Sequence, residues 1–214
     1  SKTKTQSSNY LRDSTWVDIY NSSFINSSRN QVYHKSKLVV GVENLPYKSL
    51  LEPILGNLLL DFGGTVMTRA TQTNRSVFKT KSNALVAPVI CYESMYGEFM
   101  TDYVRNGAQL IAIITNDGWW GNSPGHKQLL SYSRLRSIEL RRSIVRSANT
   151  GISAVINEKG DIINSIEYEK NGIINDKISI SNKLTFYAKY GDFISRISLF
   201  FFIIIFLFYF AKKK

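Results

Sequence analysis

The sequence predicts a layered α/β domain followed by one C-terminal membrane helix. Two observations support this fold class. Short apolar runs rich in β-branched residues alternate with helical patterns along most of the chain, which is typical of a sheet covered by helices and not of a helix bundle or a β-sandwich. The final apolar run is too long and too uniform for the surface of a soluble domain.

Four short apolar runs are expected to form strands that are buried on both faces or nearly so. They occupy residues 37–42, 85–92, 109–115 and 151–157. The segment INEKGDIIN, which overlaps the end of the last run, indicates a hairpin turn between strands.

Two helices are expected among these strands. Met95, Phe99 and Tyr103 recur at the i, i+4, i+8 spacing of one helical face, and Gly107 is well placed to end that helix. The second helix begins at Pro124, which suits the first helical position, and is expected to run to about residues 149–151. It would be strongly basic, with about half of its arginines on a solvated or salt-bridged face and others holding the helix against the sheet. These arginines are Arg134, Arg136, Arg141, Arg142 and Arg146.

Residues 194–211, ISRISLFFFIIIFLFYFA, indicate a membrane span. A helix of about 18 residues rises about 27 Å, close to the thickness of a hydrocarbon core if Arg196 extends its charge to the interface. A buried core helix is the alternative, but the aromatic density and the terminal lysines disfavour it. Because basic residues favour the cytoplasmic side, Lys212, Lys213 and Lys214 are expected inside and the preceding domain outside the cytoplasm.

The composition favours anionic partners, since 27 Lys and Arg against 16 Asp and Glu give a net charge of +11. Nucleic acid and an anionic bilayer both fit such a charge, and the predicted span selects the membrane, so no nucleic acid is expected. His34 and His126 are too few and too isolated for a metal site, and no cofactor is expected.

Cys91 is the only cysteine in the chain, so no disulfide can form within it. A free cysteine is most often a small buried apolar side chain, and the alternative is a nucleophile. Cys91 follows a predicted strand and precedes a predicted helix, at the edge where open α/β sheets gather their active residues. The positive end of a helix dipole stabilises a thiolate there, which favours the nucleophile.

The segments VYHKSKLVVGVENLP and VICYE resemble those of the nitrilase superfamily, whose members use a Glu-Lys-Cys triad. Lys35 lies in the Y-x-K segment and Cys91 in the I-C-Y-E segment. The resemblance implies that the Cys91 thiolate attacks an acyl carbon while Lys35 stabilises the developing oxyanion and a glutamate moves protons.

Longer motifs are similar to one branch of that superfamily, the apolipoprotein N-acyltransferase family. They are TNDGWWGNSPG, RLRSIELRR and RSANTGIS within residues 114–163, and TFYAKYGDF at 185–193. The similarity extends from about residue 20 to the end of the chain. It implies a nitrilase-like α-β-β-α sandwich that is incomplete at its N-terminus.

The domain organisation follows from this similarity. Residues 1–19 are polar, Ser/Asn-rich and without an initiator Met or signal region, so a linker or truncated start is expected. A partial catalytic domain is expected over 20–184, a linker over 185–193, the membrane helix over 194–211 and a basic tail over 212–214.

The family resemblance implies a specific reaction. Cys91 would take a fatty acyl group from a phospholipid as a thioester, and the amine of the diacylglyceryl-cysteine at an apolipoprotein N-terminus would then accept it. The implied location is the bacterial inner membrane, with the catalytic domain in the periplasm.

Several further residues are candidates for the site. Glu43 and Glu93 are candidates for positioning Lys35 or assisting proton transfer, although Glu93 can alternatively stabilise the first turn of its helix. Tyr92 is a candidate for shaping the acyl pocket. Trp119 and Trp120 are expected to form a membrane-facing lid, with interfacial anchors and core plugs as alternatives.

The chain departs from the family pattern in two places. It has LVVGVE where the family has L-V-P-F-G-E, with its glycine at Gly41, while Glu43 keeps its separation from Lys35. The family places its triad glutamate well before the lysine, and here Asp13 and Asp18 are the only acidic residues before Lys35. We therefore expect a C-terminal portion of the enzyme that lacks the general base, is inactive by itself and can associate with the missing N-terminal part.

Two other functions remain open from the sequence. A carbon-nitrogen hydrolase of the amidase or nitrilase type would use Cys91 and Lys35 on a small soluble substrate, but would not need a membrane helix or the TNDGWWG loop. An inactive membrane-anchored module is the second alternative, because the triad glutamate is absent.

Overall fold

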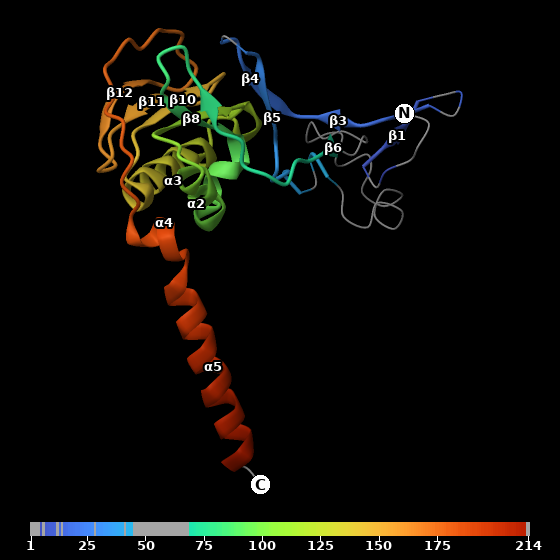
Figure 1. The fold of residues 1–214 in the computed structure, drawn as a ribbon, viewed down its shortest axis with the longest axis vertical. Helices are drawn as coiled ribbons and strands as arrows, with labels where there is room; N and C mark the ends of the chain where they lie inside the picture. Colours follow the sequence, from blue (N-terminus) through green and yellow to red (C-terminus); the bar gives the residue numbers. More distant parts are fainter. Residues whose placement is uncertain are drawn as a thin grey trace.

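The structure is a computed structural model that describes residues 5, 7–11, 13, 15–27, 29–40, 42–44 and 69–212. Its centre is a six-stranded sheet with the strand order β12-β11-β10-β9-β8-β7 (Figure 1). The strands are β7 (Phe78–Lys79), β8 (Leu85–Ile90), β9 (Leu110–Thr115), β10 (Ile144–Ala148), β11 (Ser153–Ile156) and β12 (Ile162–Ile166). Strands β8, β9 and β10 are parallel, and the outer pairings are antiparallel. The sheet therefore has the parallel centre predicted for an α/β domain.

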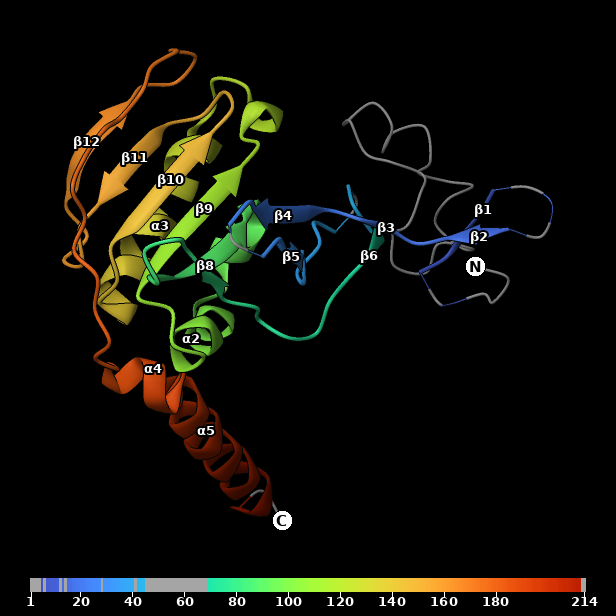
Figure 2. The same ribbon diagram turned by 45° about the horizontal axis from the view of Figure 1, so that its top comes forward.

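Two helices, α2 (Gly97–Arg105) and α3 (Pro124–Leu140), cover one face of the sheet (Figure 2). Two short 3₁₀ turns, η1 (Cys91–Met95) and η2 (Gly118–Trp120), follow the carboxyl ends of β8 and β9. A short helix α4 (Phe186–Tyr190) leads into the long helix α5 (Phe193–Lys212). The carboxyl ends of β9 and β10 point away from α5 (Figure 2).

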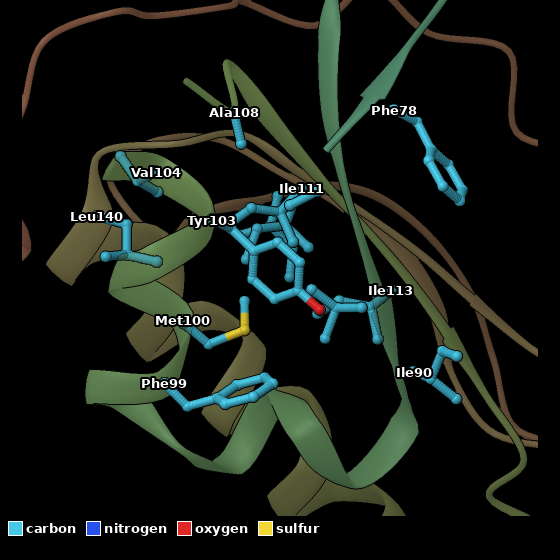
Figure 3. Packing of buried hydrophobic residues seen from close by; sticks show 14 of the residues in the cluster. Phe78, Ile90, Phe99, Met100, Tyr103, Val104, Ala108, Ile111, Ile113 and Leu140 are labelled. Atoms are coloured by element: carbon cyan, nitrogen blue, oxygen red, sulfur yellow. The ribbon is translucent and has the colours of Figure 1, made fainter. Parts of the chain in front are cut away.

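The core fills the space between α2, α3 and the sheet. Tyr103 of α2 lies at its centre, beside Met100 and facing Ile111 and Ile113 of β9 (Figure 3). All four side chains are almost fully buried. Ile111 and Ile113 both face α2 because alternate residues of a strand point to the same face of a sheet. Burial of this apolar area gives the surrounding strand ends and turns a rigid base.

Several smaller strand pairs lie N-terminal to the sheet. Strands β4 (Ser22–Ile25) and β5 (Gln31–His34) form an antiparallel hairpin that contacts β8. The remaining pairs are β1 (Asn9–Tyr10) with β2 (Trp16–Val17), and β3 (Ile19–Tyr20) with β6 (Arg69–Ala70).

The sequence predicted part of this fold, including four of the six strands of the central sheet. Strands β8, β9 and β11 lie within the predicted runs, and β11 and β12 form the predicted hairpin. Helix α2 carries Phe99 and Tyr103 on its buried face, and Gly107, with φ of 93°, follows its C-cap residue. Gly107 suits this place because a residue without Cβ adopts positive φ at little cost.

The predicted strand at residues 37–42 was wrong. The chain turns there instead, since the carbonyl oxygen of Val39 accepts hydrogen bonds from the backbone N–H groups of Val42, Glu43 and Asn44. The Glu43 carboxylate also accepts a hydrogen bond from the backbone N–H of Val39. In a sheet, that N–H would donate to a carbonyl oxygen of the neighbouring strand. Gly41 lies outside the described residues, as do Lys213 and Lys214.

The second predicted helix was too long. Helix α3 ends at Leu140, Arg141 adopts the left-handed conformation with φ of 48°, and β10 follows. Ile144 and Val145 are a sequence signal for this change, because paired β-branched residues favour a strand.

The arginines of this region are divided between α3 and β10. Arg136, Arg142 and Arg146 are buried, so they are not part of a solvated face. Arg142 donates hydrogen bonds to the carbonyl oxygens of Leu140, Arg141, Ala108 and Lys183, and so satisfies carbonyls at the end of α3. Arg134 and Arg141 are exposed.

Helix α5 is long and apolar enough to cross a membrane, with a mean hydropathy of 2.3, and none of it is buried against the domain. It leaves the domain as a single projecting helix (Figure 1). Its first turn is tied to α2 by an ion pair between Arg196 and Glu98. Arg105 of α2 also donates hydrogen bonds to the carbonyl oxygens of Ala188 and Lys189 in α4.

Candidate active site

Cys91 begins the sharp turn that follows β8. In the parallel pairing of β8 with β9, Ile90 lies opposite Ile114, which places Cys91 beside Thr115 at the carboxyl edge of the sheet. Its φ is 52°, a left-handed conformation that is unfavourable for a residue with a side chain. The side chain is half-buried against the core cluster. Backbone strain of this kind is characteristic of turns that present a nucleophile.

Lys35 follows β5 and forms a buried ion pair with Glu43. The Lys35 Nζ lies 2.6 Å from Glu43 Oε2, and the two side chains are 2% and 11% exposed. The Glu43 carboxylate also accepts hydrogen bonds from the Val39 backbone N–H (2.9 Å) and from Asn21 Nδ2 (2.8 Å). Burial alone would raise the pKa of Glu43, but the hydrogen bond and the charge of Lys35 outweigh it and lower the pKa. An ionised Glu43 therefore holds the Lys35 ammonium in a fixed place.

Glu93 joins the segment that carries Lys35 to the turn that carries Cys91. Its Oε1 accepts hydrogen bonds from the Tyr33 hydroxyl (2.6 Å) and the Ser36 backbone N–H (2.7 Å), and its Oε2 from the Ile90 backbone N–H (2.8 Å). Burial raises the pKa of Glu93, although each of these hydrogen bonds opposes the shift. The carboxylate thus organises its own turn, as the structural alternative predicted, and also fixes the position of the Lys35 segment.

Tyr92 lies between Cys91 and Glu93 in the same turn. Its ring makes an edge-to-face contact with Tyr96, with centroids 5.3 Å apart. Burial, together with the Tyr92 hydroxyl, raises the pKa of Tyr96 to about 12. The pair forms an aromatic wall beside the cysteine turn, which suits apolar ligands.

Trp119 and Trp120 lie in η2, the turn that follows β9. Strand β9 is the neighbour of β8, which leads to Cys91. Their side chains are about half exposed, so they are not core plugs. The carboxyl end of β9, which leads to this turn, points away from α5 (Figure 2). The two side chains thus lie at the same edge of the sheet as Cys91, and the membrane-facing lid stays a prediction.

A buried ion pair that the sequence analysis missed supports this turn. Asp117 and Arg146 are 0% and 1% exposed at their side chains, and their nearest oxygen and nitrogen lie 2.5 Å apart. Asp117 also accepts a hydrogen bond from the Thr115 hydroxyl (2.7 Å). A Cβ at Gly151 would lie 2.2 Å from Asp117 Oδ2, so only glycine fits there. The sequence signal was an acidic residue at a strand end together with an arginine in a β-branched run.

Asp18, one of the two acidic residues before Lys35, is engaged within the N-terminal segment. Asp18 accepts hydrogen bonds from the hydroxyls of Thr5, Ser7 and Ser8 within the N-terminal segment. In the described part of the chain, the ion-pair partner of Lys35 is Glu43. The site therefore holds the Cys91 thiol at a strained turn, a lysine fixed by an ion pair and two hydrogen-bonded carboxylates.

Comparison with known proteins identifies the family of this chain. The family model of carbon-nitrogen hydrolases matches residues 10–182, and the chain belongs to that family. The curated proteins that it is similar to include apolipoprotein N-acyltransferases. That of Shewanella oneidensis is 32% identical over 172 residues, which is 80% of this chain and 32% of the relative. That of Bradyrhizobium diazoefficiens is 37% identical over 177 residues, which is 81% of this chain and 32% of the relative.

The chain thus spans about a third of the length of the curated relatives it matches. Among solved structures, an amidase from Nesterenkonia sp. aligns over 65% of this chain and 46% of the amidase, with a TM-score of 0.46 and 15% identity.

Proposed function

We propose that this chain carries the acyl-transfer site of a phospholipid:apolipoprotein N-acyltransferase. The observation that carries the proposal is the hydrogen-bonded network around the cysteine turn. Glu93 connects the Cys91 turn to the Lys35 segment, and Glu43 holds the Lys35 ammonium. The similarity to enzymes named for N-acyl transfer gives the reaction class.

In the first step, the Cys91 thiolate attacks the carbonyl carbon of a phospholipid acyl ester. The carbonyl oxygen becomes an oxyanion, which the Lys35 ammonium stabilises. The carbon–oxygen ester bond then breaks, the departing alkoxide takes a proton from a general acid, and lysophospholipid is released. The acyl group remains on Cys91 as a thioester.

In the second step, the α-amine of a diacylglyceryl-cysteine attacks the thioester carbon. The amine loses a proton to a general base, the carbon–sulfur bond breaks, and the thiolate of Cys91 is regenerated. The product is an amide at the apolipoprotein N-terminus. Two steps through one thioester let two bulky lipids use the same site in turn, with Tyr92, Trp119 and Trp120 lining and covering it.

We propose that the general base comes from outside the described residues. Glu43 and Glu93 are engaged in holding Lys35 and the cysteine turn, and Asp18 is engaged by hydroxyls. We propose that an N-terminal part of the same enzyme supplies the carboxylate, and that this chain without it does not complete the reaction.

Acyl labelling tests the function. The full enzyme, in vesicles of phosphatidylglycerol labelled in its acyl chains, is expected to acquire a label that neutral hydroxylamine removes. Addition of a diacylglyceryl-cysteine peptide should move this label to the peptide as a hydroxylamine-resistant amide. Release as free fatty acid with no peptide product would instead indicate a hydrolase, and the absence of any label would indicate an inactive module.

The orientation in the membrane is a separate proposal. Helix α5 would cross the inner membrane with Lys212 and the two lysines after it in the cytoplasm, leaving the Cys91 domain in the periplasm. A green fluorescent protein fused after Lys214 is expected to fluoresce, and alkaline phosphatase at the same place to be inactive. The reverse result would overturn both the orientation and the periplasmic substrate.

A further inference from the structure

A hollow beside α2 begins at Tyr96, the residue that follows the cysteine turn, and is lined by residues of α2 as far as Arg105. Its volume is about 390 Å³. Tyr96 and Phe99 form its apolar floor, and charged side chains surround it. The charged lining residues are Lys37, Arg75, Glu98, Asp102 and Arg105. The mechanism above uses none of these charged groups.

The cations of the hollow outnumber the carboxylates that can neutralise them. Glu98 is paired with Arg196, outside the hollow. Asp102 is shared between Arg105, at 3.1 Å, and Arg75, at 3.8 Å. Among the described residues no carboxylate pairs with Lys37, whose ammonium lies over the rings of Tyr96 and Phe99. The hollow therefore keeps an excess of positive charge.

Arg75 has hydrogen-bonding capacity left for a ligand. Its guanidinium carbon lies 4.1 Å from the ring centroid of Phe99, a cation–π contact that helps to hold the side chain in place. The Nε is buried and makes no hydrogen bond, since the Asp102 Oδ2 that it faces lies 3.8 Å away. A buried donor without an acceptor is costly, and an anionic oxygen would satisfy it.

The hollow lies beside the start of α5. Glu98, on its rim, is the residue that pairs with Arg196 in the first turn of α5. Arg105, at the other end of α2, binds the carbonyl oxygens of α4. If α5 enters a bilayer, Arg196 lies near the interface, and the hollow then faces the layer of lipid head groups.

We propose that this hollow binds the phosphate group of a phospholipid in the leaflet that α5 enters. A phosphodiester carries one negative charge and oxygens that accept hydrogen bonds from Arg75 and Lys37. Basic pockets beside membrane helices bind lipid head groups in this way. The bound lipid would hold α2, and through it the domain, at a fixed height above the membrane. The inference rests on the proposed membrane span but not on the proposed acyl transfer.

Lipid binding by the full chain in detergent tests the site. Native mass spectrometry would follow the binding of dioleoylphosphatidylglycerol in a Cys91→Ala background, so that no lipid is consumed. Lys37→Gln/Arg75→Gln is expected to weaken binding by at least about tenfold, because two charge-assisted contacts are lost. Dioleoylglycerol, which lacks the phosphate, is expected to bind no better to the parent than to this variant.

A matched control separates the site from the overall charge. Lys127→Gln/Lys159→Gln removes the same number of charges from two exposed lysines outside the hollow, and binding should stay within about twofold. Equal weakening in both double variants would overturn the proposal in favour of general electrostatic attraction. Equal affinity for soluble sn-glycerol 3-phosphate would assign the site to a free phosphate ester and overturn the membrane role.

A third variant guards against simple loss of folding. Asp102→Asn removes the carboxylate that competes with the ligand for Arg75 and Arg105, so binding of the same lipid should become about threefold tighter. An unfolded or disordered variant could not bind more tightly. Unchanged or weaker lipid binding by a folded Asp102→Asn variant would count against a phosphate in this hollow.

Discussion

Replacing Cys91 with serine in the full enzyme is expected to lower acylation to below about a thousandth of the parent level. A serine hydroxyl is a much poorer nucleophile than a thiolate unless a strong base activates it. Because Cys91 is the only cysteine, the label cannot move to a second thiol of this chain. The measurement is the hydroxylamine-sensitive acyl label described above, compared at equal protein and lipid.

The chemistry of the bond provides an internal control for this variant. Any acyl group on a serine would be an oxygen ester, which resists neutral hydroxylamine, whereas a thioester does not. The thermal midpoint should change little, since the two side chains are similar in size and Cys91 is only half-buried. A hydroxylamine-sensitive label that persists in Cys91→Ser would show that another group is the nucleophile.

The sequence predicted the elements that carry the site because local signals there agree with the tertiary structure. β8 and β9 are short β-branched runs, and α2 has a clear apolar face ended by Gly107. Cys91 was located at a strand end by this pattern alone. Its left-handed backbone could not be predicted, because strain at a turn is imposed by the packing around it.

Buried charge was the main feature that local patterns did not reveal. Arg142 and Arg146 read as part of a basic helix, yet both are buried with their donors satisfied by carbonyls or by Asp117. Only the pairing of distant segments decides whether an arginine faces water or a partner. The role of Glu93 could not be predicted for the same reason. Its carboxylate accepts hydrogen bonds from Tyr33 and Ser36, which lie far earlier in the chain, as well as from Ile90 beside its own turn.

Trp119 and Trp120 show how the topology bears on a sequence hypothesis. A tryptophan side chain, with an apolar ring and a polar N–H, fits both an interfacial anchor and a lid. The parallel register of β8 and β9 places their turn on the same edge as Cys91, and that edge points away from α5.

Lys35→Met is expected to lower the acylation rate by about 10²-fold or more, since the oxyanion loses the positive charge that stabilises it. The Michaelis constant for the phospholipid should change less, because Lys35 acts on the transition state. Lys170→Met, at an exposed lysine, is the matched control and should acylate at the parent rate. Near-normal acylation by Lys35→Met would mean that the lysine is only a structural partner of Glu43.

Stability and catalysis can be separated at this pair. Lys35→Met leaves the Glu43 carboxylate buried without its cation, which is expected to cost about 3 to 5 kcal/mol in the free energy of unfolding. Lys35→Met/Glu43→Gln removes the unpaired charge, so most of that stability should return, as measured by urea unfolding. The acylation rate should remain low, because the ammonium is still absent. Recovery of both quantities together would show that Lys35 acts only through the fold.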